Sequence, residues 1–181
     1  MNLRFVKYLL LASCLGLTAC ASGIKRQEGV ADYKYQGEKF AGVSIKLAPA
    51  VQEKLKDDLK FNQQQLSSLV LRGMEAQGLM DRTSSHLVDI EITDVRVRNT
   101  FSAIMFGFMA GNDHVTGTVA LKQIGGVPRH AFEVSASYAL GGLGGGQDAT
   151  RLNWLYEEFA KLTVEEIKGG ANEKTAKSAN Q

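Results

Sequence analysis

Hydrophobic and polar residues alternate along four stretches of the chain, and this alternation is typical of strands that bury one face. The stretches cover residues 40–47, 86–98, 114–122 and 129–138. In the second stretch the apolar residues change from even positions, up to Ile92, to odd positions, at Val95 and Val97. A bulge near Thr93 and Asp94 would return both valines to the core.

The same bulge is expected to leave Arg96 and Arg98 outside the core. Gly125 and Gly126 lie between the last two alternating stretches and predict the turn of a β-hairpin. The strands on either side of this turn are therefore expected to pair in antiparallel order.

Two helical stretches follow the first predicted strand. Residues 50–60 come directly after Pro49 and are rich in helix-forming residues. Residues 63–79 carry one apolar face, the pattern of a helix packed on a sheet. Gly78 lies at the end of this stretch and is a candidate helix cap.

A closing helix is expected to start near Asp148 or Thr150, either of which can cap its first turn, and to continue to about residue 167. The order of elements is then β-α-β-β-β-α. This order predicts an α+β fold with a single domain, in which helices pack on one face of an antiparallel sheet.

Both ends of the chain differ from this domain, which we place at residues 33–168. Residues 20–32 are polar and aperiodic and are interpreted as a tether. Residues 169–181 are a glycine pair followed by small and polar residues, and are predicted to be a disordered tail.

The first residues are typical of a secretory signal. Arg4 and Lys7 precede ten apolar residues, 8–17, which are too few to span a bilayer that needs about 20. The sequence Leu17-Thr18-Ala19-Cys20 resembles the lipobox of bacterial lipoproteins, in which the cysteine receives a diacylglyceryl group before cleavage. Residues 1–19 are therefore predicted to be a lipoprotein signal peptide, and Cys20 the lipidated mature N-terminus. The alternative is an ordinary signal peptide with an incidental cysteine.

Several acyl chains on one residue give lasting membrane attachment. The protein is thus expected to be anchored to a membrane by its N-terminal lipid and not to cross it. Ala21 and Ser22 follow the cysteine, where an aspartate retains lipoproteins at the inner membrane of enteric-type bacteria. By resemblance to that sorting rule, the expected location is the periplasmic face of the bacterial outer membrane.

Charge and cysteine content then exclude several functions. The 21 Lys and Arg residues exceed the 19 Asp and Glu residues by two, and this excess is lost with Arg4 and Lys7. The mature chain is formally neutral, so no nucleic-acid partner is expected. Cys14 is also removed with the signal peptide, and Cys20 is then the remaining cysteine. An intramolecular disulfide and a cysteine-based zinc site are therefore not expected.

No catalytic motif stands out. The histidines His86, His114 and His130 match no zinc-binding spacing, and neither a G-x-S-x-G nor an S-x-x-K motif occurs. An enzyme would have to use Asp113, His114 and Asp148. We therefore predict that the protein is not an enzyme and has no metal or cofactor.

Three arginines, Arg96, Arg98 and Arg151, could form a basic ridge, but alternate charges on a strand usually face water. The glycine-rich residues 141–147 lack the lysine of a phosphate-binding loop and are interpreted as a connection before the last helix.

One apolar segment, residues 100–111, shows neither strand nor helix periodicity. It is a candidate interface with lipid or a partner protein, because methionine and phenylalanine adapt to irregular apolar surfaces. Its alternative is a loop folded back over the core. Trp154 is a second candidate interface residue, with partial burial under the glycine-rich segment as its alternative. The candidate interface residues of the apolar segment are Phe101, Ile104, Met105, Phe106, Phe108 and Met109.

Residues 105–114, 132–142 and 148–159 resemble a family of proteobacterial outer-membrane lipoproteins known only by a domain of unknown function, of the DUF4410 type. The resemblance covers about residues 40–168 and implies no reaction and no catalytic residues. In fold plan alone, a lipid-tethered β-α-β-β-β-α domain is similar to lipoproteins of curli secretion and exopolysaccharide export, some of which assemble into rings.

Three functions remain open. The leading expectation is a non-catalytic, lipid-anchored envelope protein that acts as an interaction or assembly module and binds a protein partner or further copies of itself. The second is a ring-forming accessory lipoprotein of secretion or export. The third is a periplasmic enzyme.

Overall fold

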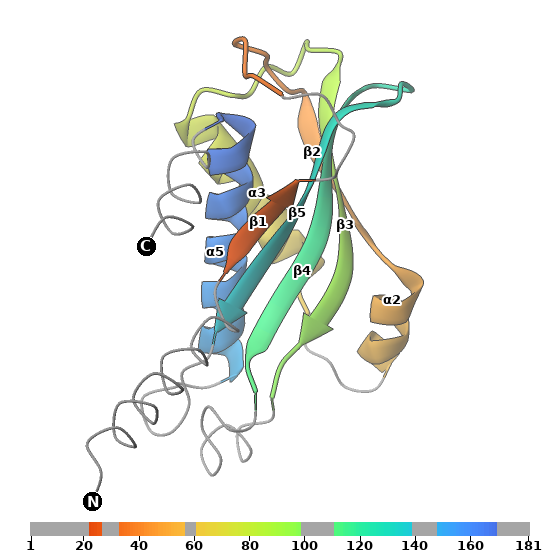
Figure 1. Cartoon of the computed structure of the whole chain (residues 1–181), viewed down its shortest axis with the longest axis vertical. Coiled ribbons are helices and arrows are strands. Elements are labelled where there is room, and N and C mark those ends of the chain that lie inside the picture. Colours follow the sequence, from red (N-terminus) through yellow and green to blue (C-terminus); the bar gives the residue numbers. More distant parts are fainter. Residues whose placement is uncertain (1–21, 27–32, 57–60, 99–110, 139–147, 170–181) are drawn as a thin grey trace, which may run out of the picture.

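The computed structural model describes residues 22–26, 33–56, 61–98, 111–138 and 148–169. Within them a five-stranded sheet is covered on one face by two long helices (Figure 1). The strands are β1 (Gly23–Arg26), β2 (Gly42–Leu47), β3 (His86–Arg96), β4 (Asp113–Gln123) and β5 (Pro128–Tyr138). The helices are α2 (Pro49–Lys56), α3 (Gln63–Ala76) and α5 (Asp148–Ile167).

The strand order in the sheet is β1-β5-β4-β3-β2. All neighbours are antiparallel except β2 and β3, which are parallel. The α+β fold with its mostly antiparallel sheet is therefore confirmed, and the parallel edge strand is an addition to it. Parallel pairing needs a crossover of a dozen or more residues, which the chain from α2 through α3 supplies.

The β4–β5 hairpin and the bulge in β3 follow the prediction. The register between β3 and β4 shifts between Ile92 and Asp94, and Val95 is buried while Arg96 is exposed. Arg98 is different: its exposed fraction is only 5%, so the prediction that it lies outside the core is wrong.

Helix α3 has the local signals of a stable helix at both ends. The side chain of Asn62 accepts a hydrogen bond from the backbone N–H of Gln65 at 3.0 Å, which satisfies one of the free donors of the first turn. Gly78 has a φ of +64°, the left-handed conformation that glycine adopts readily after a helix. The predicted cap at Gly78 is confirmed.

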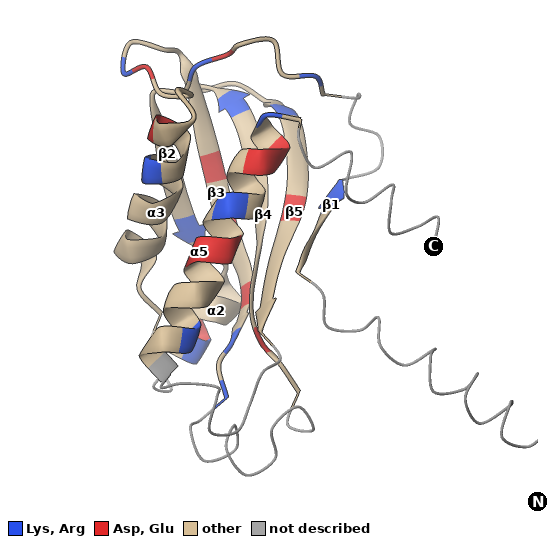
Figure 2. Cartoon of the chain, turned by 90° about the vertical axis from the view of Figure 1, so that its left-hand side faces the viewer, with Lys and Arg blue, Asp and Glu red and all other residues tan. Residues whose placement is uncertain are grey.

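The core lies between the sheet and the helix pair α3 and α5 (Figure 2). Alternate side chains of β3, β4 and β5 point toward these helices and are buried, whereas the other face of the sheet is polar. Phe159 of α5 and Leu66 of α3 are fully buried in this layer. Burying such side chains contributes about 1.5–3 kcal/mol each, so this layer is the main source of stability.

Gly117 allows α5 to approach the middle of β4. A Cβ atom at this position would lie 2.9 Å from the carbonyl oxygen of Glu91 and 3.2 Å from Cζ of Phe159. The ring of Phe159 therefore packs directly on the backbone of the strand.

Replacing Gly117 by alanine is expected to lower the free energy of unfolding by about 1–3 kcal/mol, because neither the backbone of β3 nor the Phe159 ring can move away without loosening the core. Urea unfolding measures the change. Gly23→Ala is the matched control, since no atom lies within 4 Å of its added Cβ. Equal stability of the two variants would contradict this account of the packing.

Strand β1 lies in the segment that the sequence pattern assigns to a tether. Its four residues pair with β5, from Gly23 opposite Ser135 to Arg26 opposite Phe132. Four residues are too few to show a periodic pattern, and their pairing depends on a strand that lies far away in the sequence. No helix in the described part of the chain is long and apolar enough to cross a membrane.

Candidate functional site

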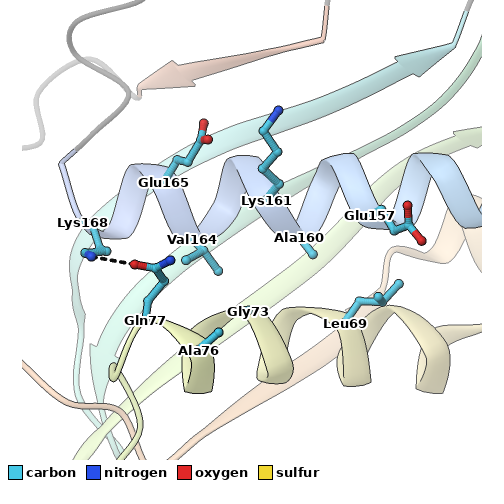
Figure 3. Close-up of a pocket in the computed structure, with 10 residues that line it drawn as sticks. All are labelled: Leu69, Gly73, Ala76, Gln77, Glu157, Ala160, Lys161, Val164, Glu165 and Lys168. Atoms are coloured by element: carbon cyan, nitrogen blue, oxygen red, sulfur yellow. Dashed lines mark hydrogen bonds between the residues drawn. The ribbon is translucent and has the colours of Figure 1, made fainter.

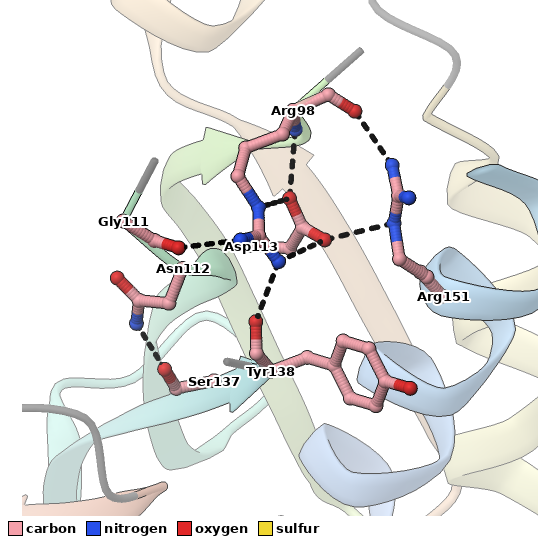
Figure 4. A network of polar contacts seen from close by, with 7 residues as sticks. All are labelled: Arg98, Gly111, Asn112, Asp113, Ser137, Tyr138 and Arg151. Carbon is pink, nitrogen blue, oxygen red and sulfur yellow. Dashed lines mark hydrogen bonds and ion pairs between the residues drawn. The ribbon is translucent and has the colours of Figure 1, made fainter. Parts of the chain in front are cut away.

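Three buried charges meet where β3 ends and β4 begins (Figure 4). The carboxylate of Asp113 is fully buried and accepts hydrogen bonds from the backbone N–H of Arg98 at 2.7 Å and from its Nε at 3.1 Å. The Nε of Arg151, on α5, lies 2.9 Å from the other carboxylate oxygen. Two guanidinium groups thus share one carboxylate inside the protein.

The same guanidinium groups also bind backbone carbonyls. Arg98 donates to the carbonyl oxygen of Gly111 at 2.6 Å and to that of Tyr138 at 3.4 Å, and Arg151 donates to the carbonyl oxygen of Arg98 at 2.6 Å. The cluster therefore connects the ends of β3, β4 and β5 to the start of α5. These contacts make it a structural clamp.

This geometry excludes a basic ridge of the three arginines, and it also corrects the expectation that both strand arginines face water. Arg98 and Arg151 converge on Asp113 in the interior, and only Arg96 is exposed. The alternation of the strand does not predict this position, because β3 ends at Arg96 and Arg98 lies beyond it.

Asp113 and His114 do not form a common site. Neighbouring residues of a strand point to opposite faces, and Nε2 of His114 lies on the polar face, 2.8 Å from Oδ2 of Asp94. Nζ of Lys54 lies 2.6 Å from Oδ1 of the same carboxylate. Burial alone would raise the pKa of Asp94, but the contacts with Lys54 and His114 outweigh it and lower that pKa. The structure places Asp148 as the first residue of α5, and its side chain lies outside the described residues.

The histidines are also separate from one another. His86 begins β3, whereas His114 lies opposite Arg96 at the other end of that strand. His130 is buried on β5. Among the residues that the structure describes, no group of three or more His, Cys, Asp or Glu side chains could hold a metal ion.

A second buried cluster surrounds Glu166 near the end of α5. Its Oε1 accepts a hydrogen bond from Nε of Arg26 at 2.6 Å and lies 3.4 Å from Nε2 of His130. The ring of His130 stacks on that of Tyr33, with 4.6 Å between the ring centroids. Burial alone would raise the pKa of Glu166, but His130 and Arg26 together lower it. Arg26 belongs to β1, so this cluster joins the first strand to the last helix.

A groove of about 590 Å³ lies between α3 and α5 (Figure 3). Small and apolar residues of the two helices form its floor, and polar and charged residues form its rim. Gly73 keeps the helices close, since a Cβ there would lie 3.2 Å from Cγ2 of Val164. The floor consists of Leu69, Gly73, Ala76, Ala160 and Val164. The rim consists of Gln77, Glu157, Lys161, Glu165 and Lys168.

Comparison with known proteins identifies the family but no reaction. A family model described as a domain of unknown function, DUF4410, matches residues 22–142. The chain belongs to the DUF4410 family. The resemblance seen in the sequence is thereby confirmed, and the match begins at the residue that precedes β1. No curated protein matches this DUF4410 chain.

Solved structures with a similar fold include two of PelC from Paraburkholderia phytofirmans, both dodecamers. Each is 13% identical to the DUF4410 chain, with TM-scores of 0.51 and 0.50. The alignments cover 81% and 82% of this chain and 97% of the PelC chains. A minor lipoprotein from Acinetobacter baumannii is 10% identical, with a TM-score of 0.41, over 72% of this chain and 94% of its own. At these identities the PelC structures show a shared fold.

The candidate interface residues of the DUF4410 chain are only partly within the described structure. Trp154 has an exposed fraction of 38% and packs against Tyr138, with 5.1 Å between the ring centroids. It is therefore partly covered and partly accessible. Cys20 and the six apolar residues between Phe101 and Met109 lie outside the described residues.

Two features were missed by sequence reasoning. Arg26 and Glu166 are 140 positions apart, and nothing in either neighbourhood indicates their pairing. The groove depends on the distance between two helices, which a periodic pattern does not contain. The small residues Gly73 and Ala160 are a weak sequence signal for it, since small residues also occur in helices that line no groove.

Proposed function

We propose that this DUF4410 protein is a non-catalytic, lipid-anchored protein of the cell envelope that acts as an interaction or assembly module at the periplasmic face of the outer membrane. The observation that carries the proposal is β1, which begins three residues after Cys20 and is part of the sheet. Cys20 and Ser22 can be separated by at most about 7 Å. A lipid on Cys20 would therefore hold the folded domain directly against the membrane.

Contacts of Ser22 indicate which end of the domain would face the lipid. Its Oγ accepts a hydrogen bond from the backbone N–H of Ser137 at 2.8 Å and donates to the carbonyl oxygen of Ser137. Ser137 pairs with His114 at the start of β4. Residues 99–110 connect the end of β3 to this same end of β4. The interpretation of the apolar segment as an interface with lipid or a neighbouring protein, one of its two alternatives, agrees with the expected position of the anchor.

The anchor is tested by Cys20→Ser in the full chain. We expect the variant to leave the membrane fraction and to appear in the soluble envelope fraction. The reason is that the proposed attachment to the membrane is the lipid on Cys20, which serine cannot carry. Fractionation followed by immunoblotting measures this, with Cys14→Ser as the matched control, since residue 14 is removed with the signal peptide. Membrane attachment of the Cys20→Ser variant would contradict the proposal.

A ring-forming accessory of secretion or export is the second candidate. The observation that favours it is the fold shared with the PelC chains, which form dodecamers and are covered over 97% of their length. Light scattering of the full lipidated chain in detergent tests self-association. A defined oligomer supports the second candidate, and a monomer at all concentrations contradicts it.

An enzyme is disfavoured by the geometry of the candidate residues. Asp113 is enclosed by two arginines, and His114 faces the opposite side of the sheet, where Asp94 holds it. A general base must reach its substrate within hydrogen-bond distance or through one water. The described residues hold Asp113 and His114 in separate structural contacts instead.

A further inference from the structure

The β4–β5 turn carries two exposed apolar side chains. Ile124 and Val127 have exposed fractions of 62% and 83%. Together with Trp154, they are the exposed large hydrophobic residues of the described chain. Gly125 lies between them with a φ of +73°, and the backbone N–H of Gly126 donates to the carbonyl oxygen of Gln123 at 2.9 Å. This tight turn presents both side chains to solvent at the end of the hairpin.

The hairpin tip is held in place from one side. The backbone N–H of Ile124 donates to the carbonyl oxygen of Ser85 at 2.8 Å. The tip is thus attached to the residues that precede β3 and does not depend on its own two strands alone. An apolar tip in a fixed position loses little conformational freedom when it binds a partner.

The groove between α3 and α5 is the apolar counterpart of this tip. Its floor is made of small aliphatic side chains, and its volume of about 590 Å³ lies in the range of small-ligand sites. The tip projects from the end of the sheet, away from the two helices (Figure 1). The tip of one molecule therefore cannot enter its own groove, whereas the tip of a second molecule can.

The charged residues next to the two surfaces include one pair of opposite sign. Arg129 follows the tip and is exposed, and its side chain makes no hydrogen bond or ion pair with the described residues. Most rim residues of the groove have partners: Lys168 donates to Gln77, and Lys161 pairs with Glu158. Glu165 is a rim residue without such a contact in the described part of the chain.

We propose that the hairpin tip of one copy, Ile124 and Val127, docks into the α3–α5 groove of a second copy, with Arg129 of the first pairing with Glu165 of the second. Because tip and groove are different surfaces, the contact is head-to-tail and continues from copy to copy. Such a series closes into a ring when the rotation at each contact divides a full turn, and forms an open filament otherwise. The inference rests on the self-association in the proposed function and specifies the surfaces that produce it.

Charge reversal in the full lipidated chain tests the pairing. In detergent, Arg129→Glu and Glu165→Arg are each expected to weaken association about tenfold, since each brings like charges together across the contact. The double variant restores the opposite charges in exchanged positions and is expected to recover association. Light scattering over a concentration series measures all three, and thermal unfolding verifies that each variant is folded.

Removal of the apolar tip is the second test. Ile124→Ser with Val127→Ser is expected to weaken association on the order of a hundredfold, because two aliphatic side chains would no longer be buried. Gln123→Ser is the matched control, as an exposed residue of the same hairpin whose side chain is not part of the apolar tip.

Cross-linking in cells locates the contact. A chain with Val127→Cys and Ala76→Cys is expected to give a ladder of disulfide-linked species on a non-reducing gel, because each copy carries one cysteine on each surface. The control pairs Val127→Cys with Ser68→Cys, an exposed residue of α3 outside the groove lining.

The outcomes separate the inference from the proposed self-association. A monomeric wild-type chain overturns both. A wild-type oligomer that is unaffected by the tip and charge variants, and that forms no ladder with Ala76→Cys, overturns this interface and leaves self-association standing. Loss of association with recovery in the double charge variant supports the interface.

Discussion

Replacing Asp113 by alanine is expected to lower the free energy of unfolding by about 3–5 kcal/mol, more than any other substitution proposed for this protein. The carboxylate is fully buried between the side chains of Arg98 and Arg151, which are also buried. Its removal leaves two positive charges in the interior without a negative partner. Burying charged groups without a partner is unfavourable, and this cost is the main part of the expected loss.

Urea unfolding of the full chain measures this effect. Asp94→Ala is the matched control, since it removes a carboxylate that also contacts two cationic side chains but is 45% exposed. An exposed ion pair contributes at most about 1 kcal/mol, so the control is expected to lose little stability. If both variants lost the same small amount, Asp113 would not be a buried clamp.

Replacing Glu166 by alanine is expected to cost about 2–4 kcal/mol. The buried carboxylate is the partner of Arg26 on β1 and lies next to His130. Arg26 is about one third exposed and can recover part of its hydration, so the loss is expected to be smaller than for Asp113. The change also releases the side-chain contact that holds β1 to α5.

The stability from Glu166 is expected to depend on pH in a defined direction. The pKa of Glu166 is lowered in the folded state, whereas a glutamate in an unfolded chain titrates at about 4.3. Its contribution is therefore complete above that pH and is lost as the pH falls through the lower folded-state pKa.

Urea unfolding at a series of pH values tests both statements about Glu166. The wild-type chain is expected to lose more stability than Glu166→Gln between about pH 5 and pH 3. Glu53→Gln is the control, because Glu53 forms an exposed i,i+3 pair with Lys56 and is expected to change stability by less than about 1 kcal/mol. Parallel pH curves for wild type and Glu166→Gln would contradict the assignment.

The two buried clusters have different consequences for an anchored protein. The Asp113 cluster stabilises the end of the sheet to which the chain returns after residues 99–110. The Glu166 cluster joins β1, the strand nearest to Cys20, to the last helix. A force or constraint applied at the N-terminus would thus be transmitted to the core and not to a free tether. This arrangement suits an anchored assembly module whose orientation must be defined.

Candidate site residues are predictable from the sequence to different degrees. Trp154 stands out as an aromatic candidate because it is the single tryptophan of the chain and precedes a run of apolar positions in α5. Asp113 and Arg151 stand out as polar residues of interest, but their contact does not, since ion pairs between distant residues leave no periodic pattern. The tip residues Ile124 and Val127 give no distinct signal, because apolar residues beside a glycine pair are a common feature of hairpins.

The sequence by itself determined the fold class, the predicted helices and strands of the domain and the bulge in β3. Those features depend on local preference and on the alternation of apolar positions, and both are properties of short segments. It also determined the expected lipid anchor at Cys20, from a short motif with a defined position.

Only the tertiary structure decided that β1 is part of the sheet, that β2 is parallel to β3, and that Arg98 is buried. It also brought α3 and α5 together to form the groove. Each of these features depends on contacts between residues that lie far apart in the chain. Such contacts contribute to stability only when the core has formed and has brought the residues together.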